Sequence, residues 1–273
     1  MYILKRTDLL MKGKRKIAAI IAVRMDSKRL PKKAIADIEG CTAIERVVNN
    51  LKPSEYIDDI IIATSTNKEN DQIEDLALRS GISIFRGDER NVVKRYIDAA
   101  EKFNANTIVR VTGDCPLVSY EIADNLIVKH LEKRAEFTTM EPNGPPIGTL
   151  SEIIELSALK KLMHKNIDLS YSEYMSFYFK CNPSIFSINV VVCPLEFTGP
   201  EFRLTLDYPE DLDLLRCIFK NFNSGKEAIP LAKTLSYLME NPEVAKINKN
   251  MPIKWRDDVK LVQKLKNVSR IPI

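Results

Sequence analysis

Short apolar runs that alternate with amphipathic stretches constrain the fold of this chain more than any other feature. The first run, Ile17 to Val23, is apolar throughout, which is typical of a strand buried on both faces of a sheet. Strands that alternate with helices along a chain favour a parallel sheet with right-handed crossovers. The pattern in the first half predicts strands at 16–23, 59–64, 82–85 and 107–111, and helices near 42–52, 68–80, 91–104 and 119–132.

The pattern changes after Met140. The segment EPNGPPIG at 141–148 carries three prolines and two glycines, so we expect a loop there. Residues 202–206 then read as a strand that returns to the main sheet, and we interpret 141–200 as an inserted arm. The second half also predicts helices near 155–164, 171–180, 209–222 and 227–240, and a strand-like run at 185–192.

The length of 273 residues suits one large α/β domain with an insertion. We predict an α/β fold with a doubly wound, mostly parallel sheet and an inserted arm at about 141–200. Residues 1–15 are expected to form a basic N-terminal extension, 16–250 the domain, and 251–273 a charged C-terminal tail.

The overall balance of residues argues against several classes of protein. A net charge of +4, from 41 basic and 37 acidic residues, is too small to predict nucleic acid as a partner. The chain contains no apolar run long enough to span a bilayer, so we expect no membrane contact. Five dispersed cysteines without a C-x-x-C pair, and only two histidines, argue against a zinc site and favour a reducing, cytoplasmic location.

Five basic residues crowd the loop RMDSKRLPKKAI at 24–35, directly after the first predicted strand. Like charges this close repel one another unless an anion lies among them. Ligands of open α/β sheets bind beyond the carboxyl ends of the strands, so the loop is a candidate cradle for a polyphosphate. A solvated basic turn is the alternative, and the charges alone do not decide between the two. The basic residues are Arg24, Lys28, Arg29, Lys32 and Lys33.

Two carboxylates follow later predicted strands. Asp114 lies in the turn TGDCPL at 112–117, and Asp207 lies in LTLDYPEDL at 204–212. Each has a structural alternative, because an aspartate in a turn often bonds its own backbone and Asp207 with Glu210 has the spacing of a capping box. Carboxylate oxygens are also the ligands that Mg²⁺ prefers, and a metal-bridged triphosphate on the basic loop needs such ligands. The two carboxylates are therefore candidates to share a divalent cation or a cation pair.

Two further strand ends carry candidate nucleotide contacts. Arg86 and Gly87 follow the third predicted strand, and Asn91 opens the next helix, whose N-terminus favours an anion. Thr64, within ATST at 63–66, ends the second strand with a small polar group that can read the edge of a base. An ordinary β-to-α turn and an ordinary strand end are the alternatives, and both stay open.

Several catalytic motifs are absent from the sequence. Without G-x-x-x-x-G-K-[ST] the chain is not a P-loop protein, and without G-x-G-x-x-G after the first strand a dinucleotide site of the usual kind is not expected. A G-x-S-x-G elbow is also absent. His130 and His164 fall in predicted helices without a nucleophile partner, so we interpret both as structural or solvated.

The loop RMDSKRLPKKAI resembles the nucleotide loop of bacterial cytidylyltransferases, whose usual form is close to A-R-x-x-S-x-R-L-P-x-K. TGDCPL, FRGDERNVVKRY and LDYPEDL resemble the same family in order and spacing over about 16–250, in particular its spore-coat polysaccharide biosynthesis protein F type. The relatives include enzymes that activate 3-deoxy-manno-octulosonate, sialic acid and pseudaminic acid as CMP conjugates. Two places depart from the pattern: Lys32 replaces a usual glycine, and Ser172-Glu173-Tyr174 stands where relatives often have Arg-Glu-His.

The resemblance implies a nucleotide-diphospho-sugar transferase fold of GT-A-like type, CTP and Mg²⁺, and a homodimer built through the arm. An acceptor oxygen would attack the α-phosphorus of CTP in line, and pyrophosphate would leave. Arg24, Lys33 and Asp114 are then the expected catalytic residues. By position, Arg24, Ser27, Arg29 and Lys33 would contact phosphates, Arg86 and Asn91 would lie near the nucleotide or the acceptor, and Asp114 and Asp207 would hold Mg²⁺. Thr64, inferred from its strand end alone, completes the expected nucleotide contacts.

Two other functions stay open at this stage. A GT-A glycosyltransferase would use the same fold with a D-x-D motif, but Asp211-Leu212-Asp213 falls inside a predicted helix. A catalytically silent nucleotide-binding relative would bind CTP without releasing pyrophosphate. For a transferase, the expected acceptor is a small acidic molecule, and a nonulosonic acid, another sugar acid, a polyol phosphate and a phosphonate all fit.

Overall fold

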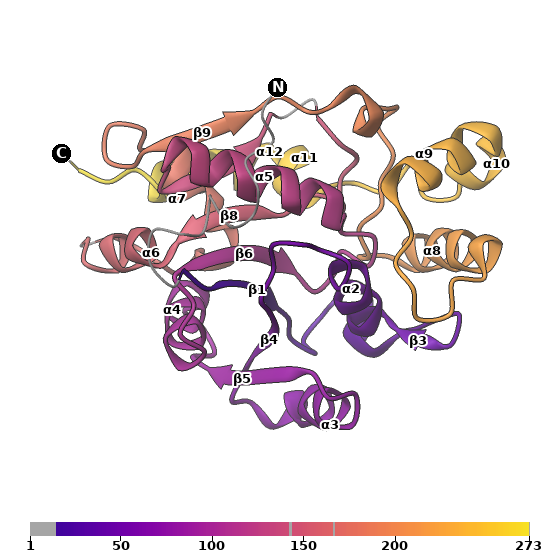
Figure 1. Cartoon of the computed structure of the whole chain (residues 1–273), viewed down its shortest axis with the longest axis horizontal. Coiled ribbons are helices and arrows are strands. Elements are labelled where there is room, and N and C mark those ends of the chain that lie inside the picture. Colours follow the sequence, from indigo (N-terminus) through magenta and orange to yellow (C-terminus); the bar gives the residue numbers. More distant parts are fainter. Residues whose placement is uncertain (1–14, 142–143, 166, 273) are drawn as a thin grey trace.

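A seven-stranded sheet organises the structure, a computed structural model that describes residues 15–141, 144–165 and 167–272. The expected basic extension at 1–15 therefore lies outside the described residues, apart from Arg15. The strands lie in the order β5-β4-β1-β6-β8-β7-β9 (Figure 1). Their bounds are β1 Ile17–Ala22, β4 Asp59–Ser65, β5 Ser83–Gly87, β6 Thr107–Thr112, β7 Phe137–Met140, β8 Glu152–Glu155 and β9 Ile188–Val191, and a separate pair is formed by β2 Asp37–Ile38 and β3 Cys41–Thr42.

The four sheet strands of the first half are parallel, as predicted. β1 pairs with β4 on one side and with β6 on the other, and β5 extends the sheet beyond β4. Parallel strands end at the same edge, so the loops that follow β1, β4 and β6 lie together there. β8 runs antiparallel to both β6 and β7, and β9 runs parallel to β7. The mostly parallel, doubly wound sheet of the prediction is thereby confirmed.

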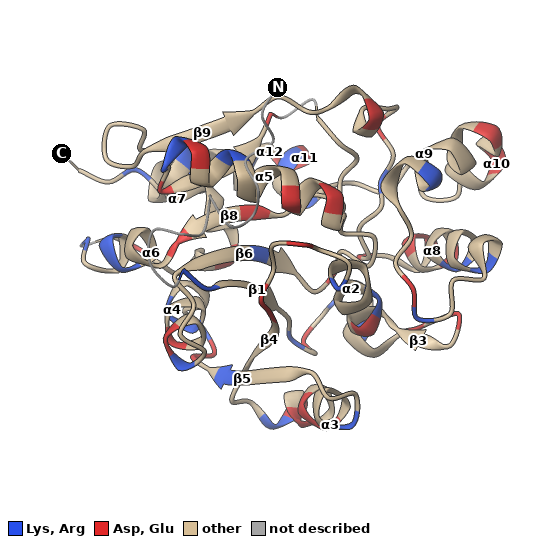
Figure 2. Ribbon diagram, viewed as in Figure 1, with Lys and Arg blue, Asp and Glu red and all other residues tan. Residues whose placement is uncertain are grey.

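Helices cover both faces of the sheet. The helices of the described residues are α2 Ala43–Leu51, α3 Asp71–Arg79, α4 Val92–Lys102, α5 Tyr120–Lys133, α6 Leu156–Met163, α7 Ser176–Lys180, α8 Pro209–Phe222, α9 Leu231–Glu240, α10 Pro242–Ala245, α11 Lys254–Asp257 and α12 Val259–Val268. Side chains alternate along a strand, so Ala19 and Ile21 of β1 pack with α2, α3 and α5, whereas Ala18 and Ile20 pack with α4, α6 and α7. Burial on both faces explains why β1 carries no charged residue, while β6 has one basic position, Arg110 (Figure 2).

The segment at 141–200, expected as an inserted arm, contributes two strands to the central sheet. β8 lies between β6 and β7, and β9 forms the edge beside β7. Its helices α6 and α7 pack on the same face of the sheet as α4. The segment is therefore built into the domain, and its expected role in a dimer stays a prediction.

The strand predicted at 202–206 does not form. Arg203 makes a single parallel bridge to Ile147, and Leu206 donates its N–H to the carbonyl oxygen of Asp114. Gly148 has φ +96 and lies so close to the backbone of Leu204 that a Cβ there would collide with it. Residues 202–206 consequently cross the carboxyl edge of the sheet, and their leucines pack with α8 in a third apolar core.

The expected C-terminal tail folds back onto the domain as α11 and α12. Leu265 and Ile271 are buried, and the side chain of Asn182 donates to the carbonyl of Ser269 and accepts from the N–H of Ile271. These bonds attach residues 269–271 to the turn that follows α7. Within the described residues, none of the helices is long and apolar enough to cross a membrane.

Candidate active site

The loop after β1 carries its basic side chains over the carboxyl edge of the sheet. Lys33 begins the 3-10 helix η1 Lys33–Ile35, and Lys32 before it has φ +58, in the left-handed region. Glycine adopts this conformation without the steric penalty of a Cβ, which explains why the family pattern has glycine at this point. Arg24 and Ser27 are half-buried in the same loop.

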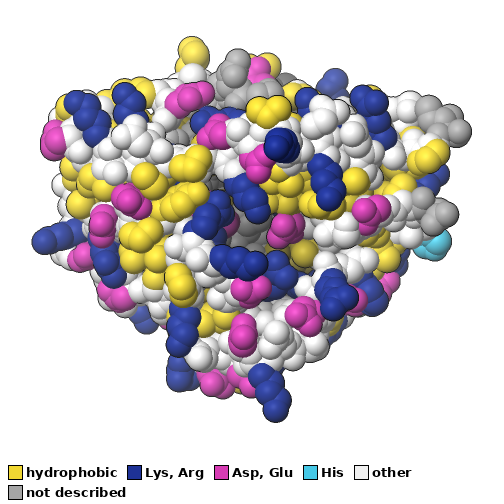
Figure 3. Space-filling view, turned by 180° about the vertical axis from the view of Figure 1, so that it is seen from behind, with side chains coloured by type: hydrophobic (Ala, Val, Ile, Leu, Met, Phe, Trp, Pro, Cys, Tyr) yellow, Lys and Arg dark blue, Asp and Glu magenta, His cyan; other side chains and the backbone are white. Residues whose placement is uncertain are grey.

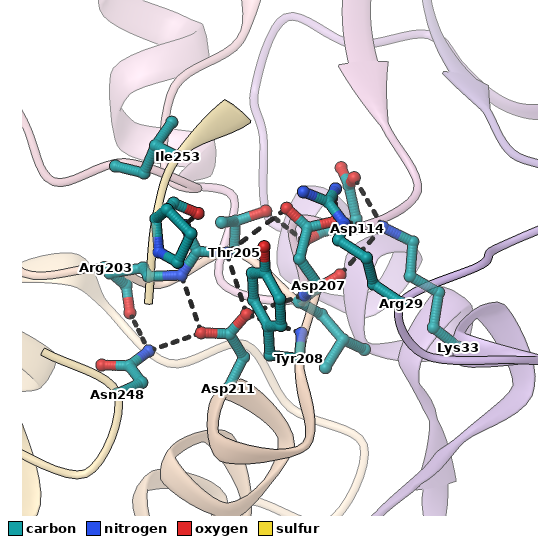
Figure 4. A network of polar contacts seen from close by, with 12 residues as sticks. Arg29, Lys33, Asp114, Arg203, Thr205, Asp207, Tyr208, Asp211, Asn248 and Ile253 are labelled. Carbon is teal, nitrogen blue, oxygen red and sulfur yellow. Dashed lines mark hydrogen bonds and ion pairs between the residues drawn. The ribbon is translucent and has the colours of Figure 1, made fainter. Parts of the chain in front are cut away.

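The ammonium group of Lys33 lies between the two predicted metal ligands. Its Nζ is 2.9 Å from Asp114 Oδ2, 2.7 Å from Asp207 Oδ1 and 2.9 Å from the carbonyl oxygen of Leu206 (Figure 4). The side chain of Lys33 is only 16% exposed. The structure thus brings together Lys33, Asp114 and Asp207, which are far apart in the sequence, at one point beyond the strand ends.

Positively charged side chains surround the carboxylate of Asp207. Arg29 Nη2 is 2.7 Å from Oδ1 of Asp207, and Arg203 Nη2 is 3.3 Å from Oδ2. The guanidinium of Arg29 also lies over the ring of Tyr208, 5.2 Å from its centre. With Lys33, three cationic side chains therefore contact one carboxylate, and the carboxylates of Asp114 and Asp211 complete the balance of charge in the cluster.

Packing sets the pKa values of this cluster. Burial alone would lower the pKa of Lys33, but the carboxylates of Asp114 and Asp207 outweigh it and raise this pKa. Burial alone would raise the pKa of Asp114, but the ammonium of Lys33 outweighs it and lowers this pKa to about 2. Lys33 therefore stays a cation and Asp114 an anion at neutral pH.

A buried group behind Asp207 holds it in place, and the sequence reasoning missed it. Arg203 donates to both oxygens of Asp211, at 2.8 and 2.9 Å, and Asn248 donates to the first of them (Figure 4). Asp211 also accepts the backbone N–H groups of Asp207 and Tyr208, so it caps α8. The capping box considered for Asp207 and Glu210 is therefore wrong. An aspartate in the first turn of a helix that begins with proline was the available signal.

Arg24 lies beside a small pocket at the same edge of the sheet. The pocket has a volume of about 220 Å³, and Figure 3 shows Lys, Arg and acidic side chains around a hollow on one face of the molecule. A larger hollow of about 520 Å³ lies between α8 and α9 and contains none of the predicted site residues. The smaller pocket is the one we assign to the site, and it is lined by Arg24, Asp26, Ser65, Asn67, Glu69, Asn70 and Glu89.

Three predicted nucleotide contacts do not join the Lys33 cluster. Arg86 lies within β5, which runs two residues further than predicted, and it pairs with Asp71 and Glu74 of α3. Asn91 caps α4 by accepting the N–H of Lys94. Thr64 is fully buried, and its hydroxyl has no hydrogen-bond partner among the described residues. Each of the three thus has a structural environment of its own, and their contact with a nucleotide stays a prediction.

The 3-10 helix η3 Ser172–Tyr174 brings the segment at 141–200 to the basic loop after β1. Glu173 Oε2 is 3.5 Å from Arg24 Nη2, and the carbonyl oxygen of Glu173 accepts from Arg110 Nη2 at 3.1 Å. Burial and the adjacent Glu173 carboxylate raise the pKa of Tyr174 to about 12, so its hydroxyl stays protonated as a donor. The sequence showed this segment only as a departure from the family pattern.

Comparison with known proteins points in one direction. A family model described as cytidylyltransferase matches residues 18–228. The chain is 26% identical over 234 residues to the spore coat polysaccharide biosynthesis protein SpsF of Bacillus subtilis. This alignment covers 84% of this chain and 96% of that protein. It is also 31% identical over 118 residues to a 3-deoxy-manno-octulosonate cytidylyltransferase of Pelobacter propionicus, in an alignment that covers 41% of this chain and 43% of that protein. A solved cytidylyltransferase from Leptospira borgpetersenii has a TM-score of 0.79 at 30% identity, covering 88% of this chain and 99% of its own.

Proposed function

Because the chain belongs to the cytidylyltransferase family and is therefore a nucleotidyltransferase, we propose that it transfers the cytidylyl group of CTP to an acidic sugar and releases pyrophosphate. The observation that carries this proposal is the meeting of Lys33 with Asp114 and Asp207 at the strand ends. Cationic side chains for a triphosphate and carboxylates for a divalent cation are both present within a single cluster there.

The basic loop would bind the triphosphate. Arg24 and Arg29 offer forked guanidinium donors to phosphate oxygens, and Lys33 offers a compact charge. The acceptor oxygen forms a bond to the α-phosphorus as the bond to the pyrophosphate oxygen breaks, and charge develops on the leaving group. Positive side chains held before the reaction begins stabilise that charge without further reorganisation. Ser27 would add a hydroxyl donor from the same loop.

Asp114 and Asp207 would hold Mg²⁺. Their oxygens both lie within 2.9 Å of the same nitrogen, so they face one position that a cation occupies. Among the described residues, no group of three or more histidine, cysteine and acidic side chains gathers for a metal, and two carboxylates suit Mg²⁺, which takes its other ligands from phosphates and water. When bound, the ion would neutralise the triphosphate and polarise its phosphoryl oxygens.

The names of the relatives support a sugar acid as the acceptor. SpsF is named for polysaccharide biosynthesis, and the relative from Pelobacter propionicus is named for 3-deoxy-manno-octulosonate. The glycosyltransferase alternative receives no support from the D-L-D sequence, because Asp211 is buried inside α8 and bound to Arg203. We therefore carry forward an acidic sugar as the acceptor class.

We further propose a homodimer and a cytoplasmic location. β9 is an edge strand, and Val190, Val192 and Leu195 on and after it expose apolar side chains, which supports a protein contact there. All five cysteines are free, which supports a reducing compartment.

The test is pyrophosphate release with Mg²⁺, each nucleoside triphosphate in turn, and a panel of sugar acids that includes 3-deoxy-manno-octulosonate. We expect release that requires both CTP and one acid of the panel. Calorimetric binding of CTP without release from any acceptor would support the silent relative instead, and the absence of CTP binding would contradict both.

A further inference from the structure

Each basic side chain of the loop that we propose as a phosphate ligand has a carboxylate partner in the structure. Lys33 and Arg29 pair with Asp207, which lies just before α8. Arg24 pairs instead with Glu173 of η3, which is 149 residues away in the sequence. A triphosphate that binds Arg24 must therefore compete with a carboxylate supplied by the segment at 141–200.

The pair between Arg24 and Glu173 is the most replaceable of these contacts. Its atoms are 3.5 Å apart and its side chains are 36% and 52% exposed. The contact between Lys33 and Asp207 is 2.7 Å long, with exposures of 16% and 13%. Solvent and salt screen an exposed ion pair far more than a buried one, so an incoming phosphate displaces Glu173 most easily.

The backbone around Glu173 is fixed by contacts that do not involve its carboxylate. Its carbonyl accepts from Arg110, which in turn donates to the buried carboxylate of Glu152 at 3.0 Å. The hydroxyl of Ser172 donates to the carbonyl of Arg90, at 3.2 Å, and accepts the N–H at the start of α4. The exchange at Arg24 therefore needs rotation of the Glu173 side chain alone, and η3 stays in place.

We infer that Glu173 is a positioning residue that competes with the phosphates of CTP for Arg24. Without nucleotide, its carboxylate keeps the Arg24 guanidinium at the pocket of about 220 Å³. With CTP bound, Arg24 serves the phosphates and the carboxylate of Glu173 turns away. This inference rests on the proposed function, because it assumes that the loop binds a triphosphate.

The experiment measures nucleotide affinity by isothermal titration calorimetry for the wild type, Glu173→Gln and the matched control Glu101→Gln. Glu101 forms an exposed ion pair with Lys160, with side-chain exposures of 49% and 45%, and does not line the pocket beside Arg24. Both variants therefore remove one carboxylate from an exposed ion pair. The probes are CTP with Mg²⁺ and inorganic tripolyphosphate. Loss of an exposed ion pair predicts about two- to fivefold tighter binding of both probes to Glu173→Gln, and little change for Glu101→Gln.

A double-mutant cycle adds a readout that a merely structural role would not move. In an Arg24→Gln background the competition is absent, so Glu173→Gln should no longer tighten binding of either probe. Equal or weaker binding by Glu173→Gln, equal tightening by Glu101→Gln, or persistence of the effect without Arg24 would each overturn the inference. If the wild type itself binds neither probe, the proposed function fails as well, whereas wild-type binding with an unchanged Glu173→Gln variant overturns this inference alone.

Discussion

At the scale of single residues, Lys33 is the side chain on which the candidate site converges. Its ammonium has three oxygen partners, Asp114, Asp207 and the carbonyl of Leu206. An ammonium group has three donors, so all of them are used before a nucleotide arrives. Lys33 can therefore bind a phosphate only if one of these carboxylates moves away to another cation. Mg²⁺, when bound, would be that cation.

Lys33→Met is expected to weaken CTP binding by about ten- to a hundredfold, because it removes a charge-assisted bond and leaves two carboxylates facing the triphosphate. The neighbouring Lys32→Met is the matched control, since Lys32 makes no recorded contact with either carboxylate. Calorimetry with CTP and Mg²⁺ measures both variants. Equal losses in the two variants would show that general charge in the loop, and not the position of Lys33, binds the nucleotide.

Lys32 itself carries backbone strain that glycine would relieve. A non-glycine residue at φ +58 costs about 1 kcal/mol relative to glycine. Lys32→Gly should therefore raise the free energy of unfolding by up to about that amount, as measured by urea denaturation. Lys28→Gly in the same loop is the control, because Lys28 is not among the described residues with positive φ. A gain from Lys28→Gly as large as that from Lys32→Gly would contradict this account.

At the scale of elements, the first turn of α8 joins the helix to the site. Asp211 is fully buried, caps the helix and neutralises Arg203, which in turn contacts Asp207. Asp211→Ala removes one partner of a buried ion pair and is expected to lower the free energy of unfolding by about 3–5 kcal/mol. Asp213→Ala changes a side chain that is 63% exposed in the same helix, so we expect a change within about 0.5 kcal/mol. Thermal and chemical unfolding of both variants check this, and similar losses would refute the role of the buried pair.

Local sequence patterns predicted the elements better than their partners. The continuous apolar run of β1 and the glycine after α3 mark a strand and a helix end by local chemistry, and both are present in the structure. Residues 202–206 alternate like a strand but bond to Ile147 and Asp114, which no local pattern reveals. The same limit applies to the site. The sequence placed Asp114 and Asp207 at one edge of the sheet, where they do meet, although the strand expected before Asp207 is absent. The contact of Glu173 with Arg24 joins segments 149 residues apart, which no local pattern reveals.

At the scale of the whole molecule, buried charges join the segment at 141–200 to the parallel part of the sheet. Glu152 of β8 lies opposite Arg110 of β6, and Lys180 and Ser176 of α7 contact the same carboxylate. Breaking a buried pair of this kind leaves an uncompensated charge, so the cluster holds two strands and a helix in one arrangement. The position of η3 beside the basic loop after β1 depends on that arrangement, because Arg110 also bonds Glu173.

This cluster makes stability sensitive to acid. Burial would raise the pKa of Glu152, but Lys180 and Arg110 outweigh it and lower this pKa to about 2. A carboxyl whose pKa is lower in the folded state stabilises the fold above its unfolded pKa, near 4.3, and loses that effect as the pH falls through the folded value. The difference in unfolding free energy between wild type and Glu152→Gln should therefore be full above about pH 4.5 and shrink towards pH 2.

Urea denaturation at a series of pH values measures that difference directly. Glu132→Gln is the control, because Glu132 forms an exposed pair with Lys129 on α5 and should show little difference from wild type at any pH. A gap between wild type and Glu152→Gln that stays constant from pH 6 to pH 2 would mean that packing, and not the charge of Glu152, ties β8 to the sheet. If this difference in unfolding free energy shrinks as the pH falls, the ionised carboxylate of Glu152 holds the segment at 141–200 against the sheet. The same carboxylate then also fixes the position of η3.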